Sequence, residues 1–307
     1  MSRTGLLDHL RDAYAGFETF LPQLIQSGFF PEGIRAGGEV LPVQVRQVFL
    51  LPPRTEEAAC YTRLRPFLRR IEADLTVGDR DCPGILLGSV PALTRGGTLL
   101  FGREPVLERV AILQLKPLPE VRLARAVERL TRPGRGETDW GRARSLLARH
   151  NSAHGSRWEM TTIASVSTSA SLENYRVRTL QDVLISSVRS ALAQMTGYWG
   201  AHPLETRADI IDLLVPCLPR MFTSLAEAHL ARSGLLQPLD TLNPLAELAH
   251  KRKVTFCGSG GVRSLHGSKT PERPVDDSHQ GRLCPVETPE SAHIGLNLHL
   301  ALGAALR

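Results

Sequence analysis

The sequence contains no uninterrupted apolar stretch of the roughly 18 to 20 residues that a membrane-spanning helix requires. Its first residues, MSRTGLLDHLRDAYAGF, lack the long apolar core of a secretory signal peptide. Its five cysteines are odd in number, widely spaced and never arranged as C-x-x-C, which argues against a disulfide framework and against a thiolate zinc site. We therefore expect a cytoplasmic protein with reduced thiols and no membrane contact.

The composition that remains is that of an ordinary globular protein. The 307 residues are 42% hydrophobic, 22% charged and 5% aromatic, which is enough chain for two domains with a buried core. The formal net charge of +6 is a mild basic excess that suits a polyanionic partner but also occurs in many proteins without one. Charge alone therefore assigns no function.

Hydrophobic spacing predicts both helices and strands in the first part of the chain. An apolar stripe at spacings of three and four predicts a helix over residues 5–26, which Pro22 kinks or ends. β-Branched and apolar residues predict a strand over residues 43–51. Residues 56–71 have weak helical spacing, and the apolar runs of residues 84–115 predict a β-hairpin or meander.

The middle of the chain changes character twice. Residues 120–130 have helical periodicity, whereas the Ser- and Thr-rich residues 150–171 have no sustained period and predict a loosely ordered connector. Thr179 and Asp182 then form the pattern of a capping box, which predicts the start of another helix.

Three shorter helices are expected after it. We predict one over residues 204–215, followed by Pro216, and one over residues 222–232. Asn243 and Pro244 form the N-cap and first-turn pattern of the third. Helices and antiparallel hairpins together indicate an α+β fold.

A glycine-rich segment at residues 258–261 raises the possibility of a phosphate-binding loop. Such a loop requires a lysine directly after the last glycine of G-x-x-x-x-G-K-[ST], but here Ser268 separates Gly267 from Lys269, and Pro271 prevents a following helix. We therefore interpret the segment up to Gly281 as a long mobile loop whose glycines adopt permissive backbone angles.

A basic cluster, His250-Lys251-Arg252-Lys253, ends the short helix that Asn243 begins. Cations at a helix C-terminus can simply complement the helix dipole. They can also contact the phosphates of a nucleic acid, because each such contact releases a counterion. The residues themselves leave both interpretations open.

A pair of glutamates, Glu287 and Glu290, lies near the end of the chain. A carboxylate pair can serve metal binding or acid–base chemistry, but the neighbouring prolines make a helix improbable, so the two side chains need not face the same way. The structural alternative is an ion pair between one glutamate and an arginine such as Arg282. Cys257 and Cys284 lack the ligand spacing of a metal or nucleophile site and are expected to be free thiols.

Two long motifs carry a family resemblance. LDTLNPLAELAHKRKVTFCGSGGV, followed by GRLCPVETPESAHIGL, resembles the fork and rifamycin-pocket region of the bacterial RNA polymerase β subunit. Weaker similarity to the β protrusion continues upstream in VPALTRGGTLLFG, ERVAILQL and YRVRTLQDVLISSVRSALAQM. By this resemblance, residues 1–132 and 172–235 are two parts of the protrusion, residues 133–171 are a connector in place of the β lobe, and residues 236–307 are a truncated fork region.

The resemblance implies a role in transcription. In the family this region forms part of the wall around the RNA–DNA hybrid and the fork loop, and the catalytic Mg²⁺ ions are held by the partner β′ subunit. We therefore expect no cofactor in this chain and no polymerase activity from it alone. The expected protein partners are the β′ and α subunits or a companion β fragment. The expected nucleic-acid partners are DNA and the RNA–DNA hybrid. The alternative is a non-catalytic truncated β-like paralogue that acts as a nucleic-acid or rifamycin-binding decoy, or a decaying duplicate.

The matching positions supply the candidate site, in which no residue is expected to be catalytic or to bind metal. By the resemblance, Lys253 replaces an arginine of the family and Thr255 a serine, changes that imply either weaker rifamycin binding or, equally, relaxed constraint on these positions. The predicted nucleic-acid-binding residues are Gln237, Lys251, Arg252, Lys253, Arg282 and Glu290. The predicted equivalents of the rifamycin pocket are Gln237, Asp240, His250, Lys253, Thr255, Pro289 and His293.

Overall fold

The computed structural model describes residues 4–102, 105–132, 139–262, 272–290 and 292–304. It divides the chain into two compact units, each assembled from separate stretches of sequence. Unit 1 comprises Met1–Ile112, Thr179–Arg252 and Leu306–Arg307, and unit 2 comprises Leu113–Arg178 and Lys253–Ala305. No helix in the described stretches is long and apolar enough to cross a membrane.

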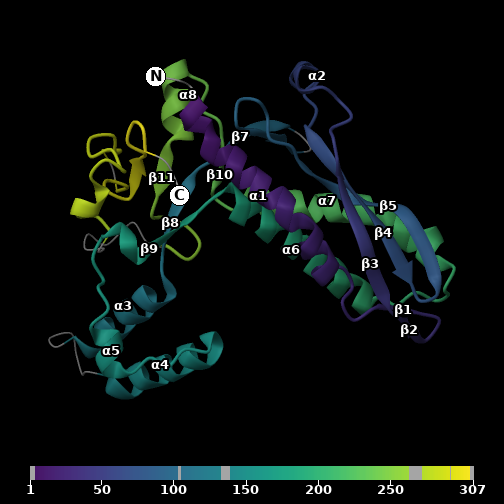
Figure 1. Cartoon of the computed structure of the whole chain (residues 1–307), viewed down its shortest axis with the longest axis horizontal. Helices are drawn as coiled ribbons and strands as arrows, with labels where there is room; N and C mark the ends of the chain where they lie inside the picture. Colours follow the sequence, from purple (N-terminus) through teal and green to yellow (C-terminus); the bar gives the residue numbers. More distant parts are fainter. Residues whose placement is uncertain (1–3, 103–104, 133–138, 263–271, 291, 305–307) are drawn as a thin grey trace. The chain divides into compact units, whose positions relative to one another are not determined.

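Three long helices form the centre of unit 1. They are α1 (Thr4–Gly28), α6 (Leu180–Ala201) and α7 (Val215–Arg232), and Figure 1 shows α1 lying along α6. The capping box predicted for Thr179 and Asp182 is confirmed at the start of α6. Each helix contributes a fully buried side chain to this core: Phe17 from α1, Leu184 from α6 and Phe222 from α7.

Small antiparallel sheets complete unit 1. One has the order β3-β4-β5 (Val43–Leu51, Leu68–Val77, Arg80–Pro91), and another the order β10-β7-β6 (Leu236–Pro238, Leu107–Ala111, Leu99–Phe101). The short hairpin β1–β2 (Ile34–Ala36, Glu39–Leu41) and two short helices, α2 (Glu57–Thr62) and α8 (Pro244–Lys251), belong to the same unit. At Gly88 in β5, an added Cβ would lie 2.4 Å from Cδ1 of Phe222, so only glycine lets α7 pack this closely on the sheet.

Unit 2 contains one sheet and a group of three helices. Its sheet has the order β12-β11-β8-β9 (Asn297–His299, Lys253–Thr255, Leu113–Pro117, Tyr175–Arg178), in which β8 and β11 are parallel and the other pairs antiparallel. Helices α3 (Pro119–Thr131), α4 (Trp140–His154) and α5 (Met160–Ala164) enclose a separate small core that includes Leu123, Leu147 and Ile163. The predicted α+β class is confirmed by both units.

Two predictions at the start of the chain need correction. Pro22 lies inside α1 and does not end it, because the helix buries an apolar stripe on both sides of the proline. The weak helix expected over residues 56–71 ends at Thr62, and Leu68 and Ile71 belong to β4. The alternating burial of β4 continues to Val77, and this two-residue period, rather than the ambiguous three-residue spacing, decides its conformation.

Two predictions in the middle of the chain were also wrong. The helix predicted over residues 204–215 does not end before Pro216, because a short π-helical turn (Ile210–Leu214) runs directly into α7 and Pro216 lies in the first turn of α7. The Ser- and Thr-rich segment expected to be loosely ordered contains the end of α4 and all of α5. Asn151 holds the connection between these helices, since its Nδ2 donates to the Trp158 carbonyl at 2.8 Å and its Oδ1 accepts from the Trp158 N–H at 3.0 Å.

Candidate nucleic-acid interface

His250 near the end of α8 joins two other predicted residues, Gln237 and Asp240, within unit 1. The Asn243 Oδ1 caps the helix by accepting from the Ala246 N–H at 2.8 Å. At the other end, Nδ1 of His250 accepts from the Asp240 N–H at 3.1 Å, so the ring proton lies on Nε2, which donates to Oε1 of Gln237 at 3.0 Å. Gln237, Asp240 and His250 therefore form one hydrogen-bonded group.

The next residue of the basic cluster, Lys251, is buried. Its side chain is 7% exposed, and its ammonium forms an ion pair with the carboxylate of Glu247, one turn earlier on α8. The Nζ atom also lies 3.8 Å from the position of an added Cβ on Gly96, in the turn between β5 and β6. Arg252 beside it is half-buried. Lys251 therefore neutralises Glu247 inside unit 1, and its contact with nucleic acid stays a prediction.

In unit 2, strand register collects polar side chains on one face of the sheet. Gln114 pairs with Arg178, and Lys116 with Arg176, across β8 and β9. Directly paired residues share a face, and residues two apart on a strand do so too. The face therefore carries Gln114, Lys116, Arg176, Arg178, Lys253, Thr255, Asn297 and His299. We call this set the polar sheet face; it has four fixed cations and no carboxylate.

The opposite face of the same sheet is apolar and buried, with Leu113, Leu115, Val254 and Leu298 each at most 9% exposed. This burial fixes which side of each strand points away from water. A one-residue slip would exchange the two faces, so the small apolar core holds the cations in register.

The glycine-rich segment packs against the polar sheet face. Nε2 of Gln114 donates to the Cys257 carbonyl at 2.9 Å and lies 3.4 Å from that of Ser259. A Cβ added at Gly260 would lie 2.5 Å from Cε of Lys116, and one added at Gly261 would lie 2.3 Å from the Phe256 carbonyl oxygen. Gly261 is thus required for this close approach to the backbone, whereas Gly260 is favoured by its positive φ of +84°. The remaining part of the rejected phosphate-loop pattern, residues 267–270, lies outside the described residues.

Burial changes the acidity of two groups beside this segment. It lowers the pKa of the Lys253 ammonium and raises the pKa of the Cys257 thiol, although the charges of Arg273 and Lys253 oppose the second effect. Thr255 is 4% exposed, and its hydroxyl donates to Oδ1 of Asn297 at 2.6 Å while accepting from the Cys257 N–H at 3.0 Å. Both hydrogen-bonding functions of that hydroxyl are used within unit 2.

The predicted residues of the C-terminal block lie in loops of unit 2. Arg282 is exposed and donates to the Ser278 carbonyl at 2.9 Å rather than to a glutamate. Glu290 is exposed and Pro289 is half-buried. Nδ1 of His293 lies 3.3 Å from Nδ2 of Asn297, so it contacts a residue of the polar sheet face.

Glu287 also contacts the edge of that face. Its carboxylate Oε1 lies 3.9 Å from Nδ1 of His299, and the same ring nitrogen donates to the Glu287 carbonyl at 3.0 Å. Glu287 and Glu290 are thus not joined in a common site. Among the residues that the structure describes, no group of three or more His, Cys, Asp or Glu side chains could hold a metal ion.

A buried ion pair fixes the geometry of unit 2. Arg125 of α3 pairs with Glu272, and the two side chains are 10% and 5% exposed. The Arg125 guanidinium also donates to the Tyr175 hydroxyl at 2.8 Å and to the Thr168 carbonyl at 3.1 Å. Burial raises the pKa of Tyr175 to about 12. This group connects α3, β9 and the segment that begins at Glu272.

The comparisons with known proteins show similarity to the RNA polymerase β subunit. Residues 237–306 match the family model RNA polymerase Rpb2, domain 3. The chain is 36% identical to the DNA-directed RNA polymerase subunit beta of Fusobacterium nucleatum over 138 residues, which is 44% of this chain and 11% of that protein. The chain is also 34% identical to the subunit beta of Kosmotoga olearia, over 52% of this chain and 13% of that protein. It is 37% identical to the subunit beta of Aquifex aeolicus, over 41% of this chain and 9% of that protein.

About half of the chain is homologous to the RNA polymerase β subunit. The matches span only about a tenth of the length of these β subunits. The β domain 3 match contains every predicted site residue, from Gln237 to His293.

The sequence prediction for this β-like chain missed most of the polar sheet face. Gln114, Lys116, Arg176 and Arg178 lie outside the domain 3 match and far from the basic cluster. The only local signal was alternation, since polar and apolar residues exchange places along LQLKP and YRVR. Glu247 and Glu272, the partners of buried cations, were missed as well.

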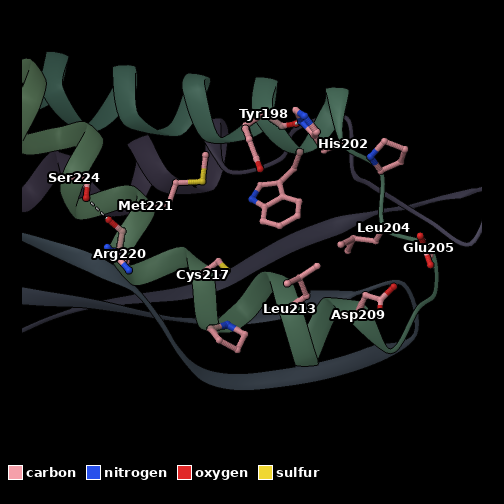
Figure 2. Close-up of a pocket in the computed structure, with 13 residues that line it drawn as sticks. Tyr198, His202, Leu204, Glu205, Asp209, Leu213, Cys217, Arg220, Met221 and Ser224 are labelled. Atoms are coloured by element: carbon pink, nitrogen blue, oxygen red, sulfur yellow. Dashed lines mark hydrogen bonds between the residues drawn. The ribbon is translucent and has the colours of Figure 1, made fainter.

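One cavity lies in unit 1 and contains none of the predicted residues. It has a volume of about 1020 Å³ and lies between the end of α6 and the start of α7 (Figure 2). The rings of Tyr198 and His202 stack on one side, with centroids 4.4 Å apart, and the exposed Cys217 lies on α7. Its lining mixes aromatic, aliphatic and charged side chains: Tyr198, Trp199, His202, Pro203, Leu204, Glu205, Asp209, Leu213, Pro216, Cys217, Arg220, Met221 and Ser224.

Proposed function

We propose that the chain is a β-subunit-like component of DNA-directed RNA polymerase that contributes a wall around the RNA–DNA hybrid and the fork loop. The observation that supports this best is the polar sheet face, where strand register places Lys116, Arg176, Arg178 and Lys253 on one side of the same sheet. Cations grouped in this way bind a phosphate backbone by releasing its counterions, largely independently of base sequence.

The remaining parts of the proposal follow the β homology. Residues 1–132 and 172–235 would form the protrusion, residues 133–171 would replace the lobe, and residues 236–307 would form the fork and rifamycin-pocket region. The Mg²⁺ ions of nucleotidyl transfer would be held by a cytoplasmic partner β′ subunit, so we expect no polymerase activity from this chain alone.

Rifamycin binding is a weaker part of this proposal. The predicted pocket residues are divided between unit 1 (Gln237, Asp240, His250) and unit 2 (Lys253, Thr255, Pro289, His293). The hydrogen-bonding atoms of His250 and Thr255 are used internally. We therefore expect rifamycins to bind weakly, as the replacement of arginine by Lys253 also implies.

Two experiments test the proposal. Affinity purification of the full chain from its native host should recover β′, α or a companion β fragment. In fluorescence anisotropy, a labelled RNA–DNA hybrid should bind in a salt-dependent manner, and Arg176→Gln/Arg178→Gln should make the slope of log K against log salt less negative by roughly 1.8, if each contact contributes about 0.9. The double variant Arg63→Gln/Arg65→Gln removes two exposed arginines of unit 1 and is the matched control.

The outcomes separate the proposal from its alternative. Hybrid binding that depends on Arg176 and Arg178, without recovery of any polymerase subunit, would favour the non-catalytic decoy. Equal hybrid binding by the wild type and the Arg176/Arg178 variant would reject the polar sheet face as the hybrid-binding surface.

A further inference from the structure

Helix α4 of unit 2 is strongly basic. From Trp140 to Trp158 the chain contains four arginines and no aspartate or glutamate. The arginines are Arg142, Arg144, Arg149 and Arg157, and all four are exposed. Figure 1 shows α4 beside α3 and α5, in a part of the chain that lies outside the domain 3 match.

The packing of α4 decides which of its faces meets water. Ala143 and Leu147, four residues apart, are buried against the small core that α3 and α5 share. The helix begins at Asp139, whose carboxylate accepts from the Arg142 N–H at 2.8 Å, and ends at Gly155 in a left-handed conformation. Both ends are therefore capped, and any anion must be bound by side chains rather than by the helix terminus.

The face opposite this core carries an alternating stripe. Arg142, Ser145, Arg149 and Ser152 follow one another at spacings of three and four, and all four are exposed. At 1.5 Å per residue, the two arginines lie roughly 10.5 Å apart along the helix axis. We call these four residues the α4 stripe.

No ion pair joins Arg142, Arg144, Arg149 or Arg157 to a carboxylate in the described parts of the chain. By contrast, Arg132 at the end of the neighbouring helix α3 forms an ion pair with Glu128. Four like charges on a short segment repel one another, so an anionic partner would relieve this repulsion.

The chemistry of the stripe favours phosphate over an acidic protein surface. A guanidinium can donate two parallel hydrogen bonds to a phosphate, and serine hydroxyls donate to phosphate oxygens as well. A protein interface needs an apolar centre. The α4 stripe has none, and Trp140, 52% exposed, stands at the start of the helix rather than within the stripe.

We propose that the α4 stripe binds the phosphate backbone of double-stranded DNA. Arg142 and Arg149 would contact the phosphates, and the hydroxyls of Ser145 and Ser152 would donate further hydrogen bonds to them. This goes beyond the proposed function, because the stripe shares no residue with the polar sheet face. The binding is sequence-independent, since the stripe offers contacts to the backbone and none that distinguish bases.

The test uses the full chain and a labelled blunt DNA duplex, with anisotropy measured over a series of NaCl concentrations. Arg142→Gln/Arg149→Gln should make the slope of log K against log salt less negative by roughly 1.8 and weaken binding roughly tenfold or more near 0.1 M salt. Glutamine is a good helix former, so circular dichroism should show an unchanged helix content. The control Arg63→Gln/Arg65→Gln carries the same change of net charge and should leave the slope nearly unchanged.

Three outcomes decide the proposal. Loss of duplex binding in the Arg142/Arg149 variant alone supports it, even if the hybrid-binding test of the polar sheet face fails. Equal losses in the Arg142/Arg149 and Arg63/Arg65 variants would overturn it, because net charge would then suffice. Displacement of the duplex by poly-glutamate as effectively as by unlabelled DNA, at equal charge concentration, would also overturn it and indicate an acidic polypeptide as the partner.

Discussion

The basic cluster at residues 250–253 and the polar sheet face of unit 2 show opposite relations between sequence and surface charge. The cluster is contiguous in sequence, but His250 is held in a hydrogen-bonded group and Lys251 is buried against Glu247. On the polar sheet face, Lys116 and Arg176 are 60 positions apart (176 − 116) and yet pair across neighbouring strands. A run of cations in a sequence therefore does not by itself indicate a cationic surface.

The two regions also differ in what their charges contribute. A buried cation needs its partner, because removal of the carboxylate leaves an uncompensated charge in a poorly solvated position. The cations of the polar sheet face are exposed or half-buried, so we expect them to contribute less to folding than a buried cation does. Variants at the two regions should thus separate stability from binding.

The largest effect is expected at the buried pair that supports the polar sheet face. Glu272→Gln leaves the Arg125 guanidinium without its carboxylate, and both side chains are almost fully buried. We expect the free energy of unfolding to fall by about 3 kcal/mol, measured by urea denaturation. Glu128→Gln, which breaks the exposed pair with Arg132, should cost at most about 0.5 kcal/mol. Equal losses in the two variants would contradict the assigned role of burial.

A smaller loss is expected within the basic cluster. Glu247→Gln removes the partner of the buried Lys251, but Glu247 is itself 40% exposed, so water can replace part of the interaction. We expect a loss of about 2 kcal/mol in unfolding free energy. Asp8→Asn, at the exposed pair with Arg11, is the control and should change stability by less than about 0.5 kcal/mol. A loss no larger than that of the control would mean that Lys251 is solvated.

A third variant tests the contact between the glycine-rich segment and the polar sheet face. The backbone at Gly260 is left-handed, with φ +84°, and Gly260→Ala would also place a Cβ 2.5 Å from Cε of Lys116. We expect a loss of about 1 to 2 kcal/mol from the backbone conformation and a further loss of hybrid affinity as Lys116 moves. Gly281→Ala, at φ +69° with no atom within 4 Å, has the backbone effect alone. Identical hybrid affinities in the two variants would show that Lys116 does not contribute to binding.

The smallest effect concerns the Cys257 thiol. Burial raises its pKa, whereas Lys253 lowers it, so Lys253→Gln should raise the pKa further and leave less thiolate at pH 8. Alkylation of Cys257 by iodoacetamide, followed by mass spectrometry, should slow only slightly, because the charge of Lys253 has the smallest effect among the groups that act on this thiol. The exposed Cys217 of the same molecule is the internal control. An unchanged or faster rate at Cys257 would contradict the electrostatic contact.

Much of the fold could be predicted from local patterns. The capping box at Thr179 and the Asn243 N-cap were found because each involves hydrogen bonds between residues three apart. The errors occurred where local signals were ambiguous. Pro216 fits both the end of one helix and the start of another, and Leu68 and Ile71 fit a helical spacing until the alternation of β4 is followed to Val77.

The candidate site was predictable only in part. The family motifs led to Gln237, His250 and Lys253, which lie in the matched β domain 3. They gave no information about Lys116, Arg176 and Arg178, since a strand does not record which other strand it will pair with. They also gave none about Glu272, whose partner Arg125 lies 147 positions earlier.

The sequence by itself determined the helix caps, the β homology and the α+β class, because each depends on residues that are neighbours along the chain. Only the tertiary structure decided that Lys251 is buried and that four cations share one face of the unit 2 sheet. The physical reason is that burial and strand pairing are set by contacts between distant segments. The apolar core under β8 and β11 fixes the register, and the register in turn determines where the charges lie.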